Sequence, residues 1–340
     1  MALQTKSADS ALQQHSRDEL LALHRTMLLN RRFEEKVGEM YTRSKIGGFL
    51  HLNIGEEGAF VGAIRALQPG DYVFSTYREH GHAITQGVEP RRVMAELFGR
   101  VDGTSKGRGG SMHLFDAQKR FMGGYAIVAG SIALAVGVSL ACVYRGTDEI
   151  VMSLFGDGAT NNGTFHESMN LAKVWNLPVV FVCVNNQYGM GTAVDRASAV
   201  SEMYRKAAGY DIPAERVDGM DVIATLDAAR KAADFVRQEK TPYFLEALTY
   251  RYRGHSMADP QNYRTKEEIE EWRHRDAIES FRKRLRDAAL ASEQDFAEHE
   301  AEVERVVQEA VDFADASREP DPATELLDNA YVGDIPVSWR

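Results

Sequence analysis

An acidic residue and an amide follow two neighbouring apolar runs of the chain, at the point where each run ends. Asp157 stands between two glycines directly after the run 151–155, and Asn186 follows the run 179–184. Apolar residues recur at helical spacing between them, which predicts a strand, a helix and a second strand. Because the carboxyl ends of parallel strands meet at one edge of a sheet, we expect Asp157 and Asn186 to be close in space.

This pair of side chains predicts a metal site. A carboxylate and an amide oxygen, together with a main-chain carbonyl, are hard ligands that suit Mg²⁺ or Ca²⁺, and Mg²⁺ typically also binds phosphate oxygens. Gly156 and Gly158 let a phosphate approach the main chain, and the following helix N-terminus favours an anion. Either turn alone more often only ends a strand. The two together favour a site for a metal and a diphosphate.

The composition sets limits on the class of protein. The chain has 340 residues, 44% of them hydrophobic, and a net charge of −10. This balance argues against a nucleic-acid-binding protein, and no apolar run is long enough to span a membrane. The N-terminal residues have neither an apolar signal core nor the composition of a transit peptide. Cys142 and Cys183 lie in apolar runs, which predicts buried free thiols in a cytoplasmic protein.

Alternating strand and helix patterns predict the fold. We expect an α/β protein with a doubly wound parallel sheet flanked by helices, and extra helices at both ends. Residues 1–16 are expected to be disordered, residues 17–330 to form a single domain and residues 331–340 to form a tail. Further predicted elements are a helix from Ser16 or Arg17 to Gly47, a helix starting at Glu56 or Glu57, a strand over 72–76, a flexible or close-approach glycine-rich loop over 101–116 and a buried helix over 123–146.

Basic residues elsewhere could extend the metal site. Arg78 could hold a phosphate through its planar fork, although an Arg beside a Glu is more often solvated. His51 stands between two leucines, where a lone His is more often structural. The loop 251–268 is either a solvated loop or a phosphate clamp; its donors are Arg251, Arg253, His255 and Arg264.

The central stretch resembles a known motif. GDG, about thirty residues and then NN, within GDGATNNGTFHESMNLAKVWNLPVVFVCVNNQYGMGT, is similar to the thiamin-diphosphate motif. The longer string resembles the alpha subunit of the decarboxylating component of 2-oxo-acid dehydrogenase complexes, from about Leu20 to about residue 330. The string GHSMADP is more similar to pyruvate-specific members than to branched-chain ones.

The resemblance implies roles for individual residues. The metal ligands it implies are Asp157, Asn186 and the carbonyl of Tyr188, and the catalytic residues are His51 and His255. The cofactor-binding residues it implies are Phe49, Tyr77, Arg78, Ala126, Val128, Asp157, Gly158, Ala159, Asn186, Tyr188, Arg251 and His255. The family usually has glycine at positions 126 and 129, where this chain has alanine. A main-chain contact there survives the added methyl group if φ is negative.

The resemblance also implies an activity and partners. It implies oxidative decarboxylation of a small 2-oxo acid, with pyruvate first, using thiamin diphosphate and Mg²⁺, and acyl transfer to a lipoyl-bearing acyltransferase component. The family activates its cofactor with a Glu from a beta subunit, which neither Glu56 nor Glu57 matches, so an α₂β₂ heterotetramer is implied.

Several questions stay open at this point. Acetoin and branched-chain 2-oxo-acid dehydrogenases are rivals within the family. A noncatalytic nucleotide- or phosphate-binding α/β protein is the rival from another class. Ser256 either matches a phosphorylation position of some eukaryotic members or is a plain loop serine. No role is assigned to three further histidines: His80, His82 and His113.

Overall fold

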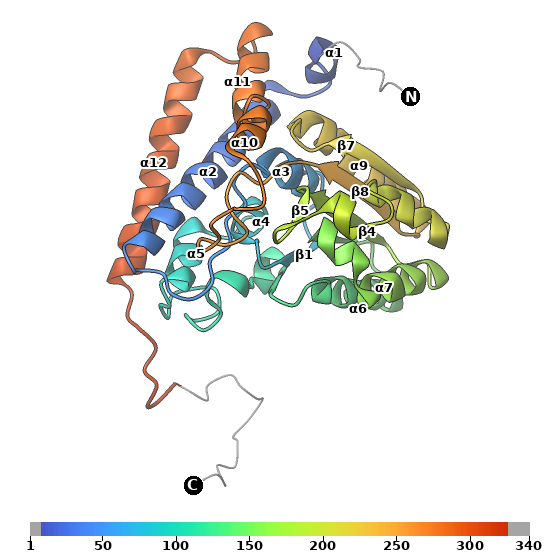
Figure 1. The fold of residues 1–340 in the computed structure, drawn as a ribbon, viewed down its shortest axis with the longest axis horizontal. Helices are drawn as coiled ribbons and strands as arrows, with labels where there is room; N and C mark the ends of the chain where they lie inside the picture. Colours follow the sequence, from blue (N-terminus) through green and yellow to red (C-terminus); the bar gives the residue numbers. More distant parts are fainter. Residues whose placement is uncertain (1–7, 326–340) are drawn as a thin grey trace.

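A six-stranded parallel sheet forms the centre of the computed structural model, which describes residues 8–325 (Figure 1). Its strands are β1 (Tyr72–Thr76), β2 (Phe121–Tyr125), β3 (Val151–Gly156), β4 (Val179–Asn185), β7 (Ala214–Asp218) and β8 (Tyr243–Leu248). They lie in the order β2-β1-β3-β4-β8-β7, and every neighbouring pair is parallel. The predicted α/β class is therefore confirmed, and the three strands predicted around the central motif and at 72–76 all form.

Alternate residues of the central strands belong to two separate cores. Val180 and Val182 of β4 face one core, and Phe181 and Cys183 face the other. The first core is covered by α2 (Arg17–Thr42), α3 (Glu57–Arg65), α4 (His80–Thr85) and α9 (Val222–Glu239). The second is covered by α6 (Gly130–Arg145) and α7 (Gly163–Val174). Helices on both faces are what a doubly wound sheet requires.

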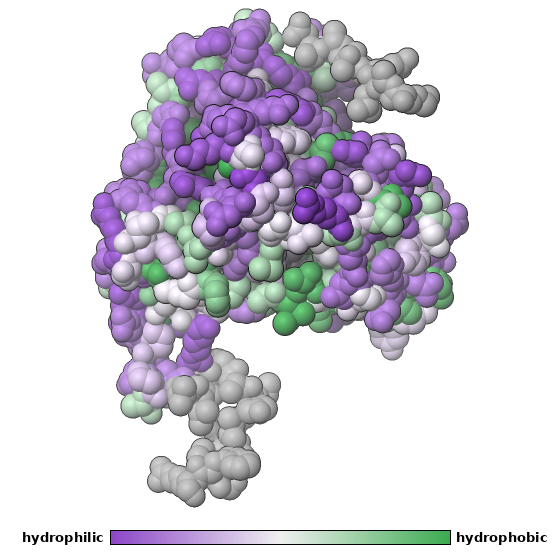
Figure 2. Space-filling model, in the orientation of Figure 1, coloured by the Kyte–Doolittle hydropathy of each residue, from purple (hydrophilic) through white to green (hydrophobic). Residues whose placement is uncertain are grey.

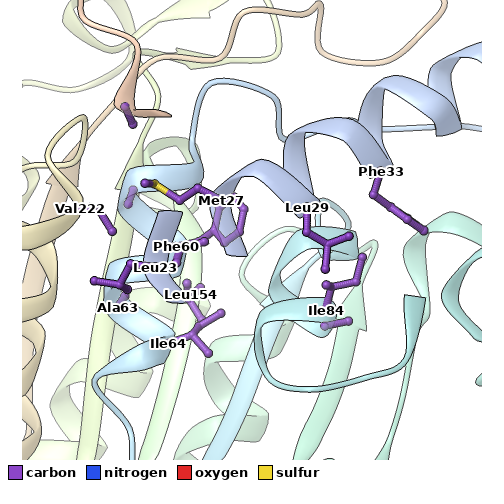
Figure 3. Close-up of a cluster of buried hydrophobic side chains, with 14 of the residues drawn as sticks. Leu23, Met27, Leu29, Phe33, Phe60, Ala63, Ile64, Ile84, Leu154 and Val222 are labelled. Carbon is purple, nitrogen blue, oxygen red and sulfur yellow. The ribbon is translucent and has the colours of Figure 1, made fainter. Parts of the chain in front are cut away.

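Figure 3 shows part of the first core, with side chains of α2, α3, α4, β3 and α9 converging. Met27 and Phe33 of α2 and Phe60 of α3 are among its fully buried members. On α2 the buried residues Leu20, Leu23 and Met27 are three and four positions apart, and a 3.6-residue period brings such positions to one face. This packing fixes α3, and with it the chain entering α3, against the sheet.

The extra helices predicted at the two ends of the chain lie side by side (Figure 1). The long α12 (Glu293–Ala316) packs along α2 and α5 (Pro90–Leu97), and a capping box at Ser292 starts it. The other elements are α8 (Val194–Ala197), α10 (Lys266–Arg273), α11 (Ala277–Asp287), β5 (Tyr188–Gly189), β6 (Thr192–Ala193) and 3-10 helices over Gly110–Met112, Ala117–Lys119, Asp157–Asn161 and Met203–Tyr210. No helix within residues 8–325 is both long enough and apolar enough to cross a bilayer.

The expected disorder of residues 1–16 does not hold for all of that segment. A short helix, α1 (Ala8–Leu12), forms there, and Leu12 is buried in the first core. His15 then contacts the carboxylates of Glu19 and Asp227 at about 3 Å. Residues 1–7, the end of the predicted domain beyond residue 325 and the predicted tail 331–340 lie outside the described residues.

Two predicted helix boundaries are wrong. The first long helix ends at Thr42, before Gly47, because Ser44 adopts a left-handed conformation with a φ of 58°. The predicted helix over 123–146 begins only at Gly130, because β2 precedes it and Ala129 has a φ of 67°. A left-handed residue cannot continue a right-handed helix. Cys142 and Cys183 are buried free thiols, as predicted.

Candidate functional site

One cavity opens at the carboxyl ends of β1, β3 and β4. The chain leaves β1 toward β2 on one side and β3 lies on the other, so the cavity is at the switch point where open α/β sheets bind ligands. Gly156 of β3 lies opposite Val184 of β4, which brings the residues after both strands to the same edge. The predicted site residues that line this cavity are Tyr77, Arg78, Val128, Asp157, Gly158, Ala159, Asn186, Tyr188 and Arg251.

Asp157 supplies a buried negative charge to the cavity. Its carboxylate forms no ion pair with any described residue, and burial raises the pKa of Asp157 to about 6. A buried carboxylate without a cationic partner is costly, and a bound cation would stabilise its charged form. A Cβ added to Gly156 would meet no atom within 4 Å, so the main chain beside Asp157 is open to a ligand.

Arg251 holds the turn that follows β4. Its Nη1 donates to the side-chain oxygen of Asn186 over 3.4 Å and to the carbonyl of Tyr188 over 3.2 Å. Its Nη2 donates to the carbonyl of Met190 over 3.2 Å. These bonds bring together the two oxygens predicted to join Asp157 around a metal. Arg251 is buried and pairs with no carboxylate among the described residues.

Arg78 is a second buried guanidinium at the same cavity. It donates to the carbonyl of Leu52 over 2.6 Å and to the carbonyl of His255 over 2.8 Å. It also lacks a carboxylate ion pair within the described part of the chain. Two buried guanidinium groups without carboxylate partners favour an anion between them, and their planar forks suit phosphate oxygens.

The donor set fits a divalent cation with a diphosphate. No three His, Cys, Asp or Glu side chains within residues 8–325 gather in a way that could hold a metal ion. A cation at this edge would therefore need a mixed set, and Asp157, Asn186 and the Tyr188 carbonyl provide one of hard oxygen atoms. The unpaired Asp157 carboxylate and the two unpaired arginines are the charges that such a ligand pair would neutralise.

Comparison with known proteins agrees with this geometry. Residues 25–323 match the family described as "Dehydrogenase E1 component". The chain belongs to the dehydrogenase E1 component family.

Curated relatives of this E1 component chain span most of its length. "Pyruvate dehydrogenase E1 component subunit alpha" of Rhizobium meliloti is 46% identical over 315 residues, which cover 92% of this chain and 90% of the relative. Proteins of the same name match from Zymomonas mobilis, at 45% over 320 residues (93% and 90%), and from Porphyra purpurea, at 43% over 312 residues (90% and 91%).

The two histidines predicted to be catalytic in this E1 chain lie behind the cavity wall. The rings of His51, Tyr77 and His255 contact one another, with centroids 4.7 to 5.6 Å apart, and only Tyr77 lines the cavity. Burial, followed by the nearby Arg78, lowers the pKa of His51 to about 3 and that of His255 to about 4. Both imidazoles are therefore neutral at pH 7. Their catalytic roles stay predictions.

Other predicted residues also lie away from the cavity lining. Phe49 is 70% exposed, and neither it nor Ala126 lines the cavity. Of the arginines in the loop 251–268, only Arg251 reaches the cavity, because Arg253 is exposed and Arg264 donates to carbonyls of the same loop. Among these arginines, only Arg251 is therefore placed to meet a phosphate in the cavity.

Glu56 is a site residue that the sequence did not reveal. It directly precedes α3, where a helix start was predicted, but its side chain makes no capping hydrogen bond there. Instead it lines the cavity and accepts a hydrogen bond from Asn186 over 2.7 Å. Burial raises the pKa of Glu56 to about 7, against the lowering effect of Arg78 and Arg251. Only the contact across 130 positions identifies its role, and no local pattern encodes it.

His82 is another lining residue without a predicted role. Its Nδ1 lies 2.6 Å from the hydroxyl of Ser75, and its Nε2 is buried with no hydrogen-bond partner. Burial lowers the pKa of His82 to about 3, so the ring is neutral. Thr76 and Tyr125 complete the wall on this side.

The glycine-rich loop of the E1 chain is bound to a buried acid. Glu96 of α5 is fully buried, and its two oxygens accept from four main-chain N–H groups at 2.7 to 3.1 Å. The donors are Ser105, Gly107, Gly109 and Gly110. Glu79 accepts from the N–H of Leu114 farther along. Of the two predicted alternatives, the close-approach loop is the one that forms: a Cβ added at Gly103, Gly107 or Gly109 would lie only 2.3 to 2.6 Å from a neighbouring atom.

Ala129 does not meet the condition of a negative φ under which a main-chain contact survives the added methyl group. Its φ of 67° lies in the left-handed region, whereas Ala126 is not among the residues with a positive φ. A Cβ in this region contacts the neighbouring carbonyl oxygen, which glycine avoids. The methyl group at position 129 therefore strains the cavity wall just before α6.

Proposed function

We propose that the chain is the alpha subunit of a pyruvate dehydrogenase that uses thiamin diphosphate and Mg²⁺. The observation that carries the proposal is the unpaired Asp157 carboxylate beside Asn186 and the Tyr188 carbonyl, facing two unpaired arginines at the switch point. The family to which the chain belongs is thiamin-diphosphate dependent. Relatives named for pyruvate dehydrogenase cover at least 90% of the chain, which favours pyruvate over acetoin or a branched-chain acid.

In this proposal the residues of the cavity hold the cofactor. Asp157, Asn186 and the Tyr188 carbonyl bind Mg²⁺, while Arg78 and Arg251 neutralise the diphosphate and the main chain at Gly158 and Ala159 approaches it. When bound, thiamin diphosphate supplies the electron sink for decarboxylation. The residues of the cavity orient this group, and their charged side chains face it before the reaction begins. The neutral His51 and His255 lie behind Tyr77, where they can hold its ring in place.

A beta subunit is part of the proposal. Ile127, Val128 and Met190 line the cavity and are 76%, 47% and 64% exposed. Figure 2 shows a mostly hydrophilic face with strongly apolar surface confined to a few patches. Large apolar side chains at a cavity rim favour a protein partner that covers them. The assembly proposed is an α₂β₂ heterotetramer that passes the acetyl group to a lipoyl-bearing acyltransferase component.

Reconstitution with the beta subunit tests the proposal. We expect the complex, with thiamin diphosphate and Mg²⁺, to reductively acetylate a lipoyl acceptor fastest with pyruvate and more slowly with 2-oxoisovalerate or acetoin. The chain alone should be inactive, and Asp157→Asn should remove both activity and cofactor binding. Activity of the purified chain without a partner would contradict the proposal. Binding of a mononucleotide with no response to thiamin diphosphate would instead favour a noncatalytic nucleotide-binding protein.

A further inference from the structure

Glu56 contacts the part of Asn186 that a metal would not use. Its Oε1 accepts a hydrogen bond from Nδ2 of Asn186 over 2.7 Å, and the two residues are 130 positions apart. Both side chains are buried. Glu56 ends the segment before α3, whereas Asn186 follows β4, so packing of α3 onto the sheet sets this contact.

The chemistry of the neighbours fixes which way the Asn186 amide points. The carboxylate form of Glu56 only accepts hydrogen bonds, so the amide NH₂ turns toward it, and Oε1 accepts from Nδ2 over 2.7 Å. On the other side of the amide, two donors meet its oxygen: the N–H of Tyr188 at 3.3 Å and Nη1 of Arg251 at 3.4 Å. A flipped amide would place NH₂ against these two groups, which can only donate, and its oxygen against the carboxylate form of Glu56.

Of the two neighbouring acids, Glu56 and Glu57, only Glu56 contacts Asn186. Glu57 is equally buried, but Arg31 binds it with two hydrogen bonds of 2.6 and 2.9 Å, and it does not line the cavity. Arg31 also pairs with Asp276 of the outer helices. Glu57 therefore belongs to an ion-pair network that joins helices, while Glu56 faces the site.

We propose that Glu56 is a positioning residue that holds the Asn186 amide with its oxygen directed to the metal. The inference rests on the proposed function, because it assumes that Asn186 is a ligand of Mg²⁺. Side chains that orient metal ligands in this way commonly change metal affinity by about 10- to 100-fold when they are removed. Arg251 contributes from the opposite side by binding both Asn186 and Tyr188.

The inference is tested by the Mn²⁺ affinity of the complex with the beta subunit. This affinity is measured by electron paramagnetic resonance in the presence of thiamin diphosphate. Glu56→Leu should weaken Mn²⁺ binding by about 10- to 100-fold. Glu56→Gln keeps an oxygen that accepts from Asn186, so it should restore binding to within about threefold of the parent complex. Glu57→Gln is the matched control, which should lower the unfolding temperature and leave Mn²⁺ affinity unchanged.

A second variant keeps the test independent of folding defects in Glu56→Leu. With Asn186→Asp, both side-chain oxygens accept, so the orientation no longer matters and adding Glu56→Leu should cause no further loss. Unchanged Mn²⁺ affinity in Glu56→Leu would overturn the inference. So would an equal loss in Glu56→Gln, because charge and not amide orientation would then be responsible.

Asp157→Asn separates this inference from the proposed function. If Asp157→Asn abolishes Mn²⁺ binding and Glu56→Leu has no effect, the metal site stands and only the positioning role is wrong. If Asp157→Asn binds Mn²⁺ as tightly as the parent complex, the proposed metal site itself is wrong. If Asp157→Asn abolishes Mn²⁺ binding, and Glu56→Leu weakens it while Glu56→Gln does not, the results support both the metal site and the positioning role of Glu56.

Discussion

Arg78 and His255 are 177 positions apart, and the guanidinium of the first donates to the carbonyl of the second over 2.8 Å. The same guanidinium binds the carbonyl of Leu52. One side chain at the end of β1 thus joins the loop that carries His51 to the loop that carries His255. The contacts of the two histidines with Tyr77 depend on this junction.

Replacing Arg78 by Lys should therefore weaken cofactor binding. A lysine has no planar fork and cannot keep both carbonyl contacts while it faces a diphosphate. A hydrogen bond to a charged group contributes about 1.5–3 kcal/mol, so we expect about 10- to 100-fold weaker binding of thiamin diphosphate by calorimetric titration of the complex. Arg305→Lys is the control, because Arg305 is exposed and pairs with Glu309 on the surface of α12. Equal affinities for both variants would show that Arg78 does not bind the diphosphate.

Glu96→Ala should release the glycine-rich loop. The four N–H groups that it binds would lose their acceptor, and a buried unsatisfied donor costs about 1–3 kcal/mol. We expect faster amide hydrogen exchange at Ser105, Gly107, Gly109 and Gly110, and a free energy of unfolding lower by at least about 3 kcal/mol.

A control for this prediction lies at the start of the same helix. Glu89 is half exposed and contacts Arg91, so Glu89→Gln should leave exchange in the loop unchanged. Glu96→Gln keeps one oxygen but turns an NH₂ toward two donors, so it should resemble the alanine variant. Unaltered exchange in Glu96→Ala would mean that the loop is held by other contacts.

Ala129→Gly should stabilise the protein. Glycine removes the Cβ strain at a φ of 67°, which costs about 1–2 kcal/mol, although part of the gain is lost to the entropy of the unfolded chain. We expect a net increase of about 1 kcal/mol in the free energy of unfolding, measured with urea. Ala126→Gly is the matched variant and should lower it by about 0.5–1 kcal/mol, because Ala126 does not have a positive φ. A loss of stability in both variants would contradict the strain argument.

The stability of the protein should fall between pH 7 and pH 5 partly through His24. Its Nδ1 lies 2.9 Å from Nδ1 of His299, and burial, followed by His299 and Arg282, lowers the pKa of His24 from 6.5 to about 4. The unfolded chain therefore binds a proton near pH 6.5 that the folded chain does not. The stability from neutral His24 is present above pH 6.5 and is lost as the pH falls toward 4.

Urea unfolding of His24→Gln at both pH values measures this contribution. The drop in the free energy of unfolding from pH 7 to pH 5 should be smaller than in the parent by about 1–2 kcal/mol. Gln can still bond to His299, which separates the titration from the lost contact. Identical pH dependence of the two proteins would show that His24 is not held neutral by the fold.

The strands and the metal-binding edge could be predicted because their signals are local. Apolar runs that end in glycine or asparagine define β3 and β4, and their parallel pairing brings Asp157 and Asn186 to one edge. β2 could not be predicted, because its glycines and the apolar helix that follows merge into one run. An unbroken apolar run shows neither the two-residue period of a strand nor the 3.6-residue period of a helix.

Contacts between distant positions explain what the sequence did not reveal. Glu56 and Glu96 look like ordinary acids at the start and in the body of a helix. Their roles come from partners that the tertiary fold supplies: Asn186 for the first, and a loop of N–H groups for the second. An acid on a helix is usually solvated, but both of these side chains are buried. A buried carboxylate needs partners that a solvated one does not.

Because the two faces of β4 belong to separate cores, the helix layers on either side of the sheet can change in sequence independently. Phe181 and Cys183 belong to the core on the α6–α7 side, and Val180 and Val182 belong to the core on the side of α2, α3 and α9. Substitutions that reshape the outer surface of α6 and α7 need compensation in one core alone, while Glu56 and α3 keep their packing on the other. Descendants of such a chain could change their partner surface without rebuilding the cofactor edge.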